Sequence, residues 1–255
     1  EKGKKESLTP LGLVVLLVVA ALVYWQGVNG PFLLDDYSNI LSNQALAFED
    51  LDWEAFKAAT WSGHAGPLQR PVAMASFALD VAIAGELSAF QFKLTNVLLH
   101  LLTGLLLFFL SRVLVRQHAS LLGRDASATR AVWSADRVAL VVTGLWLLHP
   151  LHVSTVLYVV QRMTILAALF AVAAMLCYLG GRRWLAAGRT WRGLALAVGG
   201  TVAFGTLSVY SKENGALLVV LLLVVEAAFF RFDFGPRAPA WVRPLVVAGL
   251  ALPSL

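Results

Sequence analysis

The chain has 255 residues, of which 59% are hydrophobic and 14% are charged. This composition excludes a soluble globular domain, and the mean hydropathy of +0.75 is that of an integral membrane protein. The formal net charge of +5 comes from basic residues scattered between hydrophobic runs, which excludes a nucleic-acid-binding face and leaves membrane lipids as the anionic partners.

The first apolar run follows the basic segment EKGKK, an arrangement that also occurs in secretory signal peptides. We expect the run to be retained as a membrane span, because it is long for a signal core and lacks a small-x-small cleavage site. The 28 residues from Ser7 to Leu34 carry no charge, and the acids Asp35 and Asp36 follow directly. The acid pair is therefore expected just outside the first span.

The long loop at 28–92 is expected to carry two juxtamembrane helices. The apolar residues of the first helix recur at helical intervals within QALAFEDLDWEAFKAAT: Phe48, Leu51, Ala55 and Ala59. The second helix, in RPVAMASFALDVAIAG, begins with Pro71 in its first turn. Because this helix is short and contains Asp80, we expect it to lie beside the membrane rather than span it.

A helix that crosses the hydrocarbon core needs about 20 apolar residues. Six uncharged stretches approach this length, and a seventh begins at Pro244 and is incomplete at residue 255. The six run approximately over 8–27, 94–111, 138–158, 163–181, 193–210 and 214–230. The sequence thus predicts an all-α integral membrane protein, a polytopic bundle of about seven spans, with one transmembrane domain over 1–255.

The loops alternate in their content of lysine and arginine. With the N-terminus in the cytoplasm, the inner segments hold 15 basic and 5 acidic residues, and the outer segments hold 5 basic and 9 acidic residues. The excess of positive charge on cytoplasmic loops predicts this orientation. It places the loop at 28–92 on the outer face and suits a bacterial inner membrane, which we favour, or the endoplasmic reticulum.

Polar side chains gather at this predicted outer face. Three cations stand where an apolar run begins or ends: Arg70, Arg162 and Lys212. Further candidates for a pocket at this face are His149, His152, Gln161 and Glu213. A carboxylate can accept the proton of an attacking hydroxyl, and nearby cations can stabilise the charge on a departing phosphate. This pattern indicates group transfer on a phosphorylated lipid.

Each of these residues also has a structural interpretation. An acid pair outside a span commonly marks topology, and taken alone the pair fits that interpretation better than catalysis. Arg162 and Lys212 are also typical of cations that snorkel to headgroups. The histidines of HPLH have no clear third ligand nearby, so no metal site is expected.

The order of several motifs resembles a known family. The first span and its acid pair are followed by GPLQRPVAMASFALD, FKLTNVLLHLLTGLLLFFL, HPLHVSTVLYVVQRMTILAALFA and YSKENGALL. Together they resemble the polytopic GT-C glycosyltransferases, and in particular the transmembrane O-mannosyltransferase-like proteins that carry tetratricopeptide repeats. The likeness extends from about residue 31 to about residue 218.

The resemblance implies transfer of a sugar from a polyprenyl-phosphate-linked donor to a hydroxyl of a protein or glycan, on the non-cytoplasmic face. In that family an acid of the first outer loop is the catalytic base, which corresponds here to Asp35 or Asp36, with Asp35 preferred. Basic residues at the outer ends of later spans bind the donor phosphate, which corresponds to Arg162 and Lys212, with Arg70 as a further candidate.

Some members of the family need a divalent metal and others do not. Since this sequence has no compact metal motif, we expect no metal cofactor. The family usually has more spans and often a soluble tail, so the acceptor stays open. Two other functions also stay open, namely a lipid or solute transporter or flippase, and a non-catalytic membrane subunit that docks a partner.

Overall fold

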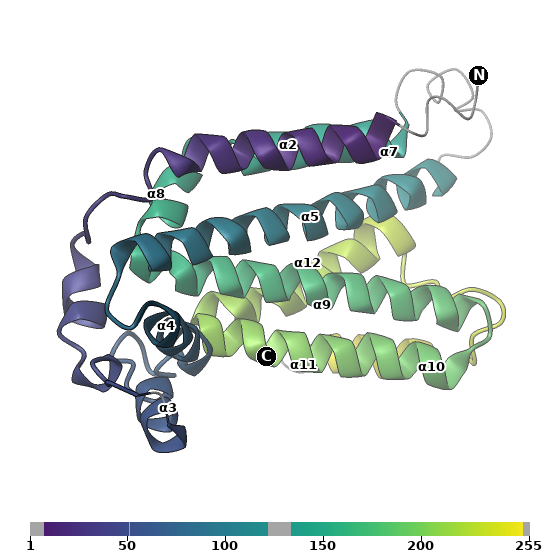
Figure 1. Ribbon diagram of the computed structural model, residues 1–255. Coiled ribbons are helices and arrows are strands. Elements are labelled where there is room, and N and C mark those ends of the chain that lie inside the picture. The colour runs from purple at the N-terminus through teal and green to yellow at the C-terminus, as the bar shows by residue number, and fades with distance from the viewer. Residues whose placement is uncertain (1–7, 51, 122–133, 252–255) are drawn as a thin grey trace. The chain divides into compact units, whose positions relative to one another are not determined.

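The computed structural model describes residues 8–50, 52–121 and 134–251, and every regular element in these ranges is helical (Figure 1). The α-helices are α2 (Leu8–Trp25), α3 (Trp53–Thr60), α4 (Pro71–Ala84), α5 (Ala89–Leu121), α7 (Ala135–Leu147), α8 (His152–Leu157), α9 (Arg162–Ala186), α10 (Thr190–Leu194), α11 (Gly200–Ser211), α12 (Leu218–Val225) and α13 (Val242–Ala251). Short 3₁₀ or π-helical segments occupy Tyr37–Leu41, Gln44–Leu46, Val159–Gln161, Ala195–Gly199, Glu213–Leu217 and Glu226–Phe230.

Four helical segments of the described chain are long and apolar enough to cross a membrane: Ala89–Ser120, Val159–Ala186, Thr190–Ser211 and Glu213–Phe230. The chain is therefore a multi-pass membrane protein. These segments match four of the expected spans, whereas α2 is a shorter apolar helix. The count of about seven spans stays a prediction, and the basic start of the chain and residues 252–255 lie outside the described residues.

The stretch expected as one span over 138–158 is interrupted in the structure. Helix α7 ends at Leu147 and α8 begins at His152. Pro150 lies between them, and proline has no backbone N–H and disfavours a helical conformation of the preceding residue. The proline therefore divides this stretch into two shorter helices.

The helix expected to begin at Pro71 is confirmed. Helix α4 has Pro71 in its first turn, and it ends at Gly85, whose φ of 73° is readily adopted by glycine. Asp80, one of the two reasons for expecting a juxtamembrane helix, is only 3% exposed and is buried against other parts of the chain. The other reason, the short length of the helix, remains, and the juxtamembrane position stays a prediction.

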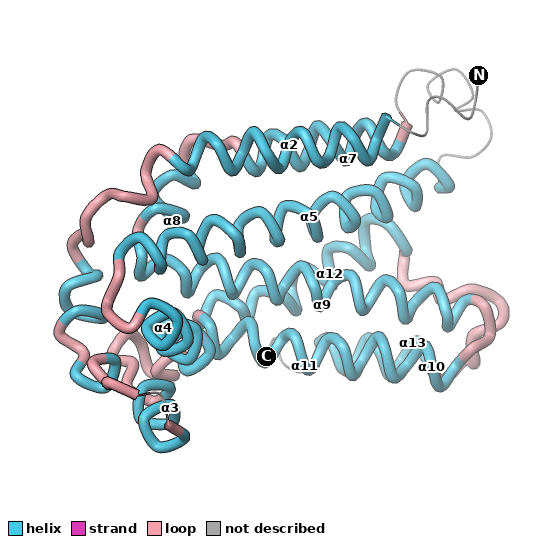
Figure 2. The backbone as a smooth tube through the Cα atoms, in the orientation of Figure 1, coloured by secondary structure: helices cyan, strands magenta, loops and turns pink. Residues whose placement is uncertain are grey.

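The first helix of the long loop is shorter than expected. It begins at Trp53, where the Asp52 side chain accepts a hydrogen bond from the Ala55 N–H at 2.7 Å. This is the usual chemistry of a helix N-cap, and it fixes the start of α3. The preceding residues form a 3₁₀ turn and loop (Figure 2), and Leu51 lies outside the described residues.

The chain folds as two compact units. Unit 1 takes in residues 1–105, 144–169 and 207–215, and unit 2 takes in residues 106–143, 170–206 and 216–255. The expectation of a single transmembrane domain stays a prediction.

Unit 1 has a small apolar core beside a buried polar contact. Tyr24, Val28, Val97 and Val156 pack together there, and each is at most 5% exposed. The Tyr24 hydroxyl donates to the Leu147 carbonyl at 3.1 Å. This bond ties α2 to the end of α7, close to the break at Pro150.

Unit 2 contains the larger apolar core, built from α9, α12, α13 and their neighbours. Two glycines, Gly181 and Gly193, permit close contact between helices there. A Cβ atom on Gly181 would lie 2.4 Å from the Ala197 nitrogen. Small residues at helix contacts are a common packing device in membranes. Glu226 is fully buried and accepts hydrogen bonds from Tyr178 and Arg182.

Candidate active site

The two acids after the first helix have different environments. The Asp36 side chain is fully buried, and its carboxylate accepts backbone hydrogen bonds from Leu33 at 2.9 Å and Val160 at 2.8 Å. Asp35 is exposed. Burial raises the pKa of the Asp36 carboxyl, and these N–H groups and the charge of Lys93 oppose the rise. Asp36 therefore holds the turn through these hydrogen bonds, and Asp35 is the acid that is open to solvent.

The turn that carries Asp35 is strained and is held by a hydrogen bond to a distant part of the chain. Leu34 has a φ of 34°, an uncommon value for a residue with a branched side chain. The Asp35 N–H donates to the Tyr158 hydroxyl oxygen at 2.7 Å. The pKa of that hydroxyl is raised, first by burial and also by the carboxylates of Asp35 and Asp36. The hydroxyl therefore keeps its proton beside the acid pair.

Lys93, near the start of α5, holds the chain segment just before the acid pair. Its ammonium group is buried and donates to the carbonyl oxygens of Gly30 and Pro31, both at 2.8 Å. The chain leading from α2 to the acid pair is thus tied to α5. The lysine acts on the position of this segment and is not exposed to solvent.

Arg162 is fully buried, whereas the sequence predicted it as a ligand of the donor phosphate. Its guanidinium donates to the Asp80 carboxylate at 2.5 Å and to the Asn96 side chain at 2.8 Å. It also donates to the carbonyl oxygens of Phe92 and Ser76 and to the Ser76 hydroxyl. A guanidinium has five N–H donors, and all of them have protein acceptors here. This geometry does not support binding of a donor phosphate by Arg162, which instead joins α4, α5 and α9.

Arg70 and Glu213 form a partly exposed ion pair in unit 1. The shortest contact joins Arg70 Nη2 to Glu213 Oε2 at 2.9 Å, with 18% and 31% of the two side chains exposed. Arg70 also lies 3.2 Å from the Met163 sulfur. Gly66 leaves room for the pair, since a Cβ there would lie 2.1 Å from Glu213 Oε1. The ion pair is thus built from three separate parts of the chain.

The backbone before α4 is unusual. Gln69 and Arg70 are both left-handed, with φ values of 57° and 51°. Such residues cost about 1–3 kcal/mol each and persist where the surroundings fix them, often at ligand sites. The strain and the ion pair with Glu213 together fix the direction of the Arg70 side chain.

Lys212 lies near this pair and is partly buried. Its ammonium donates to the Thr164 hydroxyl at 2.8 Å, and that hydroxyl donates to the Gln161 side-chain oxygen at 2.8 Å. The pKa of Lys212 is lowered, first by burial and then by the charge of Arg70, while Glu213 opposes this effect. Arg70, Lys212 and Glu213 are named here the basic cluster.

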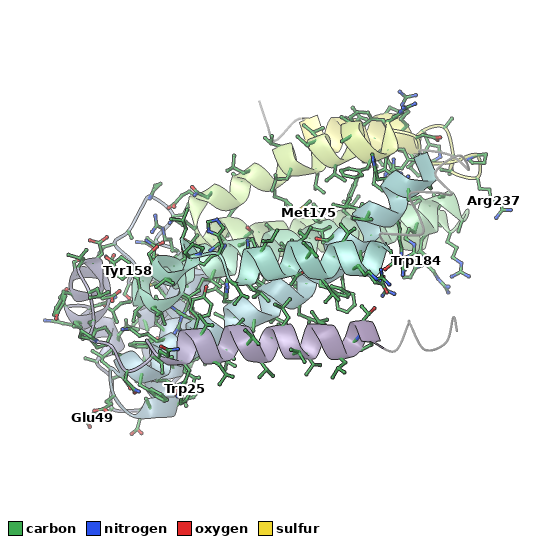
Figure 3. The ribbon with its side chains drawn as sticks, turned by 90° about the horizontal axis from the view of Figure 1, so that it is seen from above. Trp25, Glu49, Tyr158, Met175, Trp184 and Arg237 are labelled. Atoms are coloured by element: carbon green, nitrogen blue, oxygen red, sulfur yellow. The ribbon has the colours of Figure 1, made fainter. Side chains whose placement is uncertain are left out.

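The segment Tyr158–Thr164 contacts both groups. Tyr158 and Val160 hydrogen-bond to Asp35 and Asp36, which together form what is named here the acid turn. Met163 contacts Arg70, and Thr164 contacts Lys212. Figure 3 shows Tyr158 at the same end of unit 1 as Glu49, among many oxygen and nitrogen atoms. One short stretch of chain thus connects the acid pair to the basic cluster.

His149 and His152 belong to a different group of side chains. The His152 ring lies 4.7 Å from Trp146 and 5.3 Å from the buried His100, and His149 lies 6.1 Å from His152, between ring centroids. The pKa of His152 is lowered, first by burial and then by His149. These contacts stabilise the break between α7 and α8, whereas Gln161 and Glu213 lie with the basic cluster.

Among the residues that the structure describes, no group of three or more His, Cys, Asp or Glu side chains is placed to hold a metal ion. The expected lack of a metal cofactor stays a prediction.

Sequence reasoning did not identify Tyr158, Thr164 or the partners of Arg162. Tyr158 stands at the end of an apolar run, which marks it only as an interfacial tyrosine. The pairing of Arg162 with Asp80 joins residues 82 positions apart. No local pattern in the sequence signals such a contact.

The chain is similar to several curated proteins. It is 28% identical over 217 residues to a protein O-mannosyl-transferase of Drosophila melanogaster, Tmtc2, over 81% of this chain and 21% of that protein. It is 28% identical to human TMTC4 over 63% of this chain and 22% of that protein. With a relative from Caenorhabditis elegans, F38B6.6, the identity is 21% over 89% of this chain and 29% of that protein.

No family model and no solved structure matches the chain. The chain spans about a fifth to under a third of the length of the three relatives described above. Its similarity is to the portion of these proteins that it covers, and each of the three bears the name protein O-mannosyl-transferase.

Proposed function

We propose that this chain is the catalytic membrane portion of a glycosyltransferase, which moves a sugar from a polyprenyl-phosphate-linked donor to a hydroxyl of a protein or glycan on the non-cytoplasmic face. Mannose is the proposed sugar, from the names of the relatives. The observation that carries the proposal is the connection of an exposed acid to a partly exposed basic cluster through Tyr158–Thr164.

In the proposed reaction, the Asp35 carboxylate takes the proton of the acceptor hydroxyl while that oxygen attacks the anomeric carbon. The bond from this carbon to the phosphate oxygen breaks, and the phosphate leaves with the electron pair. The charge that develops on the phosphate is offset by Arg70 and Lys212. The transfer inverts the anomeric configuration, because attack and departure occur on opposite faces of the sugar.

The environments of the two acids favour Asp35 as the base. A base must reach the substrate within hydrogen-bond distance, and Asp35 is exposed whereas Asp36 is enclosed by backbone N–H groups. Asp36, Tyr158 and Lys93 then serve as positioning residues. Arg162 is proposed to position the same segment by holding the start of α9 to α4 and α5.

Arg70 is the proposed phosphate ligand with the stronger hydrogen-bonding capacity, because a guanidinium can bind phosphate through two parallel N–H bonds. In the described structure the Arg70 guanidinium is paired with the Glu213 carboxylate: Arg70 Nη2 and Nε lie 2.9 and 3.2 Å from Glu213 Oε2. The donor phosphate would replace part of this contact and keep Arg70 paired. Glu213 therefore holds the arginine in position for the phosphate.

The first test concerns Arg70. We expect Arg70→Gln to raise the KM for the lipid donor by about tenfold or more, since a hydrogen bond to a charged group contributes about 1.5–3 kcal/mol. Steady-state kinetics with varied donor and saturating acceptor measure this change. Lys57→Gln is the matched control, because Lys57 lies in the same loop and pairs at the surface with Glu54. An unchanged KM in the Arg70 variant would remove Arg70 from the proposal.

The second test uses pH. A lysine is cationic below its pKa, and the pKa of Lys212 is lowered from its ordinary value of 10.5. We therefore expect donor affinity to fall as the pH rises towards this lowered pKa. Lys212→Arg should move the fall to higher pH, because arginine stays charged. An identical pH profile in both proteins would show that Lys212 does not hold the phosphate.

The function itself is tested with the purified chain in lipid vesicles. Polyprenyl phosphate carrying radiolabelled mannose is supplied with an acceptor peptide rich in serine and threonine, and labelled peptide and released polyprenyl phosphate are measured. Transfer, or slower release of mannose to water, supports a transferase. A folded chain that neither transfers nor releases sugar from any polyprenyl-phosphate donor contradicts the proposal.

A further inference from the structure

We propose that unit 2 contains a binding site for the phosphodiester headgroup of an anionic phospholipid, in the loop between Phe230 and Val242. The loop borders a solvent-open cavity of about 370 Å³. Arg231, Asp233 and Arg243 are the charged residues that line it. This site is separate from the acid pair and the basic cluster, all of which belong to unit 1.

The backbone of the loop is bent around the cavity. Arg231 and Phe232 are left-handed, with φ values of 52° and 55°, and Gly235 has a φ of 84°. Two successive non-glycine residues in this region carry strain that tertiary contacts must hold. The bend explains how residues of one short loop can line a common concave surface.

The base of the loop is held by a buried arginine. Arg182 forms an ion pair with the fully buried Glu226, and it donates to the Asp233 carbonyl oxygen at 2.8 Å. Its guanidinium also lies 4.0 Å and 4.3 Å from the ring centroids of Phe230 and Phe234. The loop is thus fixed to the core of unit 2, so the cavity is preformed.

The charges around the cavity fit a phosphodiester. Arg231 and Arg243 are exposed, and guanidinium groups bind phosphate oxygens through paired hydrogen bonds. Asp233 is engaged by the Gly235 N–H at 2.8 Å, so one of its oxygens already has a donor. Two cations and one carboxylate leave a net positive lining, which favours an anionic headgroup over a zwitterionic one.

The position of the loop fits the depth of a lipid headgroup. The membrane-spanning segment Glu213–Phe230 ends at the residue before Arg231. Trp241 follows Ala240 of the cavity lining, and its ring lies 6.2 Å from that of Trp191 between centroids; the two residues are 46% and 78% exposed. Exposed tryptophans are typical of the membrane–water interface. Figure 3 shows Arg237 of this loop and Trp184 at the same end of unit 2. A phosphate at this depth belongs to a lipid of the same leaflet.

The test measures lipid retention by native mass spectrometry. The purified chain in detergent is incubated with equal amounts of phosphatidylglycerol and phosphatidylcholine, and the bound lipids are counted. We expect wild-type protein to retain phosphatidylglycerol preferentially, and Arg231→Gln/Arg243→Gln to weaken this retention about tenfold. Arg189→Gln/Arg237→Gln is the matched control: it removes the same charge from exposed arginines that do not line the cavity. The control should bind like wild type.

Three results would overturn the proposal. Equal retention of the two lipids by wild-type protein would exclude selective headgroup binding, whether or not any variant folds. Equal losses in both double variants would show attraction to a general basic surface. Complete displacement of the lipid by inorganic phosphate would identify the ligand as a free phosphate ion. Arg231→Lys/Arg243→Lys keeps both charges and is expected to retain the preference for phosphatidylglycerol.

Discussion

Replacing Asp35 by asparagine should lower the rate of sugar transfer by about 100-fold to 10,000-fold, the range expected for loss of a general base. The Asp35 side chain is exposed, and the hydrogen bond that its backbone N–H donates to the Tyr158 hydroxyl oxygen is kept in the variant. Thermal stability in detergent should therefore not change. Single-turnover kinetics with a saturated donor complex separate this effect from donor binding.

Asp36→Asn is the control for Asp35→Asn, because it makes the same replacement of one carboxylate oxygen by an amide NH₂ in the neighbouring acid. An asparagine has one acceptor oxygen and would place N–H donors against the N–H of Leu33 or Val160. The cost should be about 1–3 kcal/mol, measured as a lower melting temperature. If instead Asp36→Asn loses transfer at full stability while Asp35→Asn stays active, the base is Asp36.

The second large effect is expected at Arg162. Arg162→Met should destabilise the protein by about 3–5 kcal/mol, because it leaves the Asp80 carboxylate buried without its cation. Thermal unfolding in detergent measures the loss. Asp80→Asn should also destabilise, by leaving the guanidinium without its charged partner. Arg116→Gln is the control, since Arg116 is an exposed arginine whose loss should have little effect.

A double variant distinguishes the two roles considered for Arg162. Arg162→Met/Asp80→Leu removes both charges, so its destabilisation should be smaller than the sum of the single changes. Asn96 loses a partner in either case, so stability should recover only in part. A folded Arg162→Met protein with normal stability and a raised KM for the donor would restore Arg162 as a phosphate ligand.

Features with a local cause were predictable from the sequence. Pro71 set the start of α4, and the long apolar runs set the four helices that can cross a membrane. Apolar patterns predicted the helix bounds wrongly where a capping residue or a proline acts against them. The N-cap chemistry of Asp52 overrides the apolar periodicity that suggested an earlier helix start. Likewise, Pro150 divides a stretch that hydropathy alone treats as continuous.

The roles of individual charged residues were less predictable, because burial depends on contacts between distant segments. Asp35 and Asp36 are adjacent and chemically identical in the sequence, yet only Asp36 meets the Val160 N–H, 124 positions away. Arg162 and Arg70 both stand at the edge of apolar runs. One is surrounded by acceptors from α4 and α5, while the other keeps a partly exposed guanidinium.

The short stretch from Tyr158 to Thr164 gives the acid turn and the basic cluster a shared mechanical dependence. Neighbouring residues of one stretch cannot shift independently, so a displacement of this stretch by a bound lipid or a protein contact would alter proton acceptance and phosphate binding in the same event. A distant perturbation that moves this stretch should therefore change proton acceptance by Asp35 and phosphate binding by the basic cluster together.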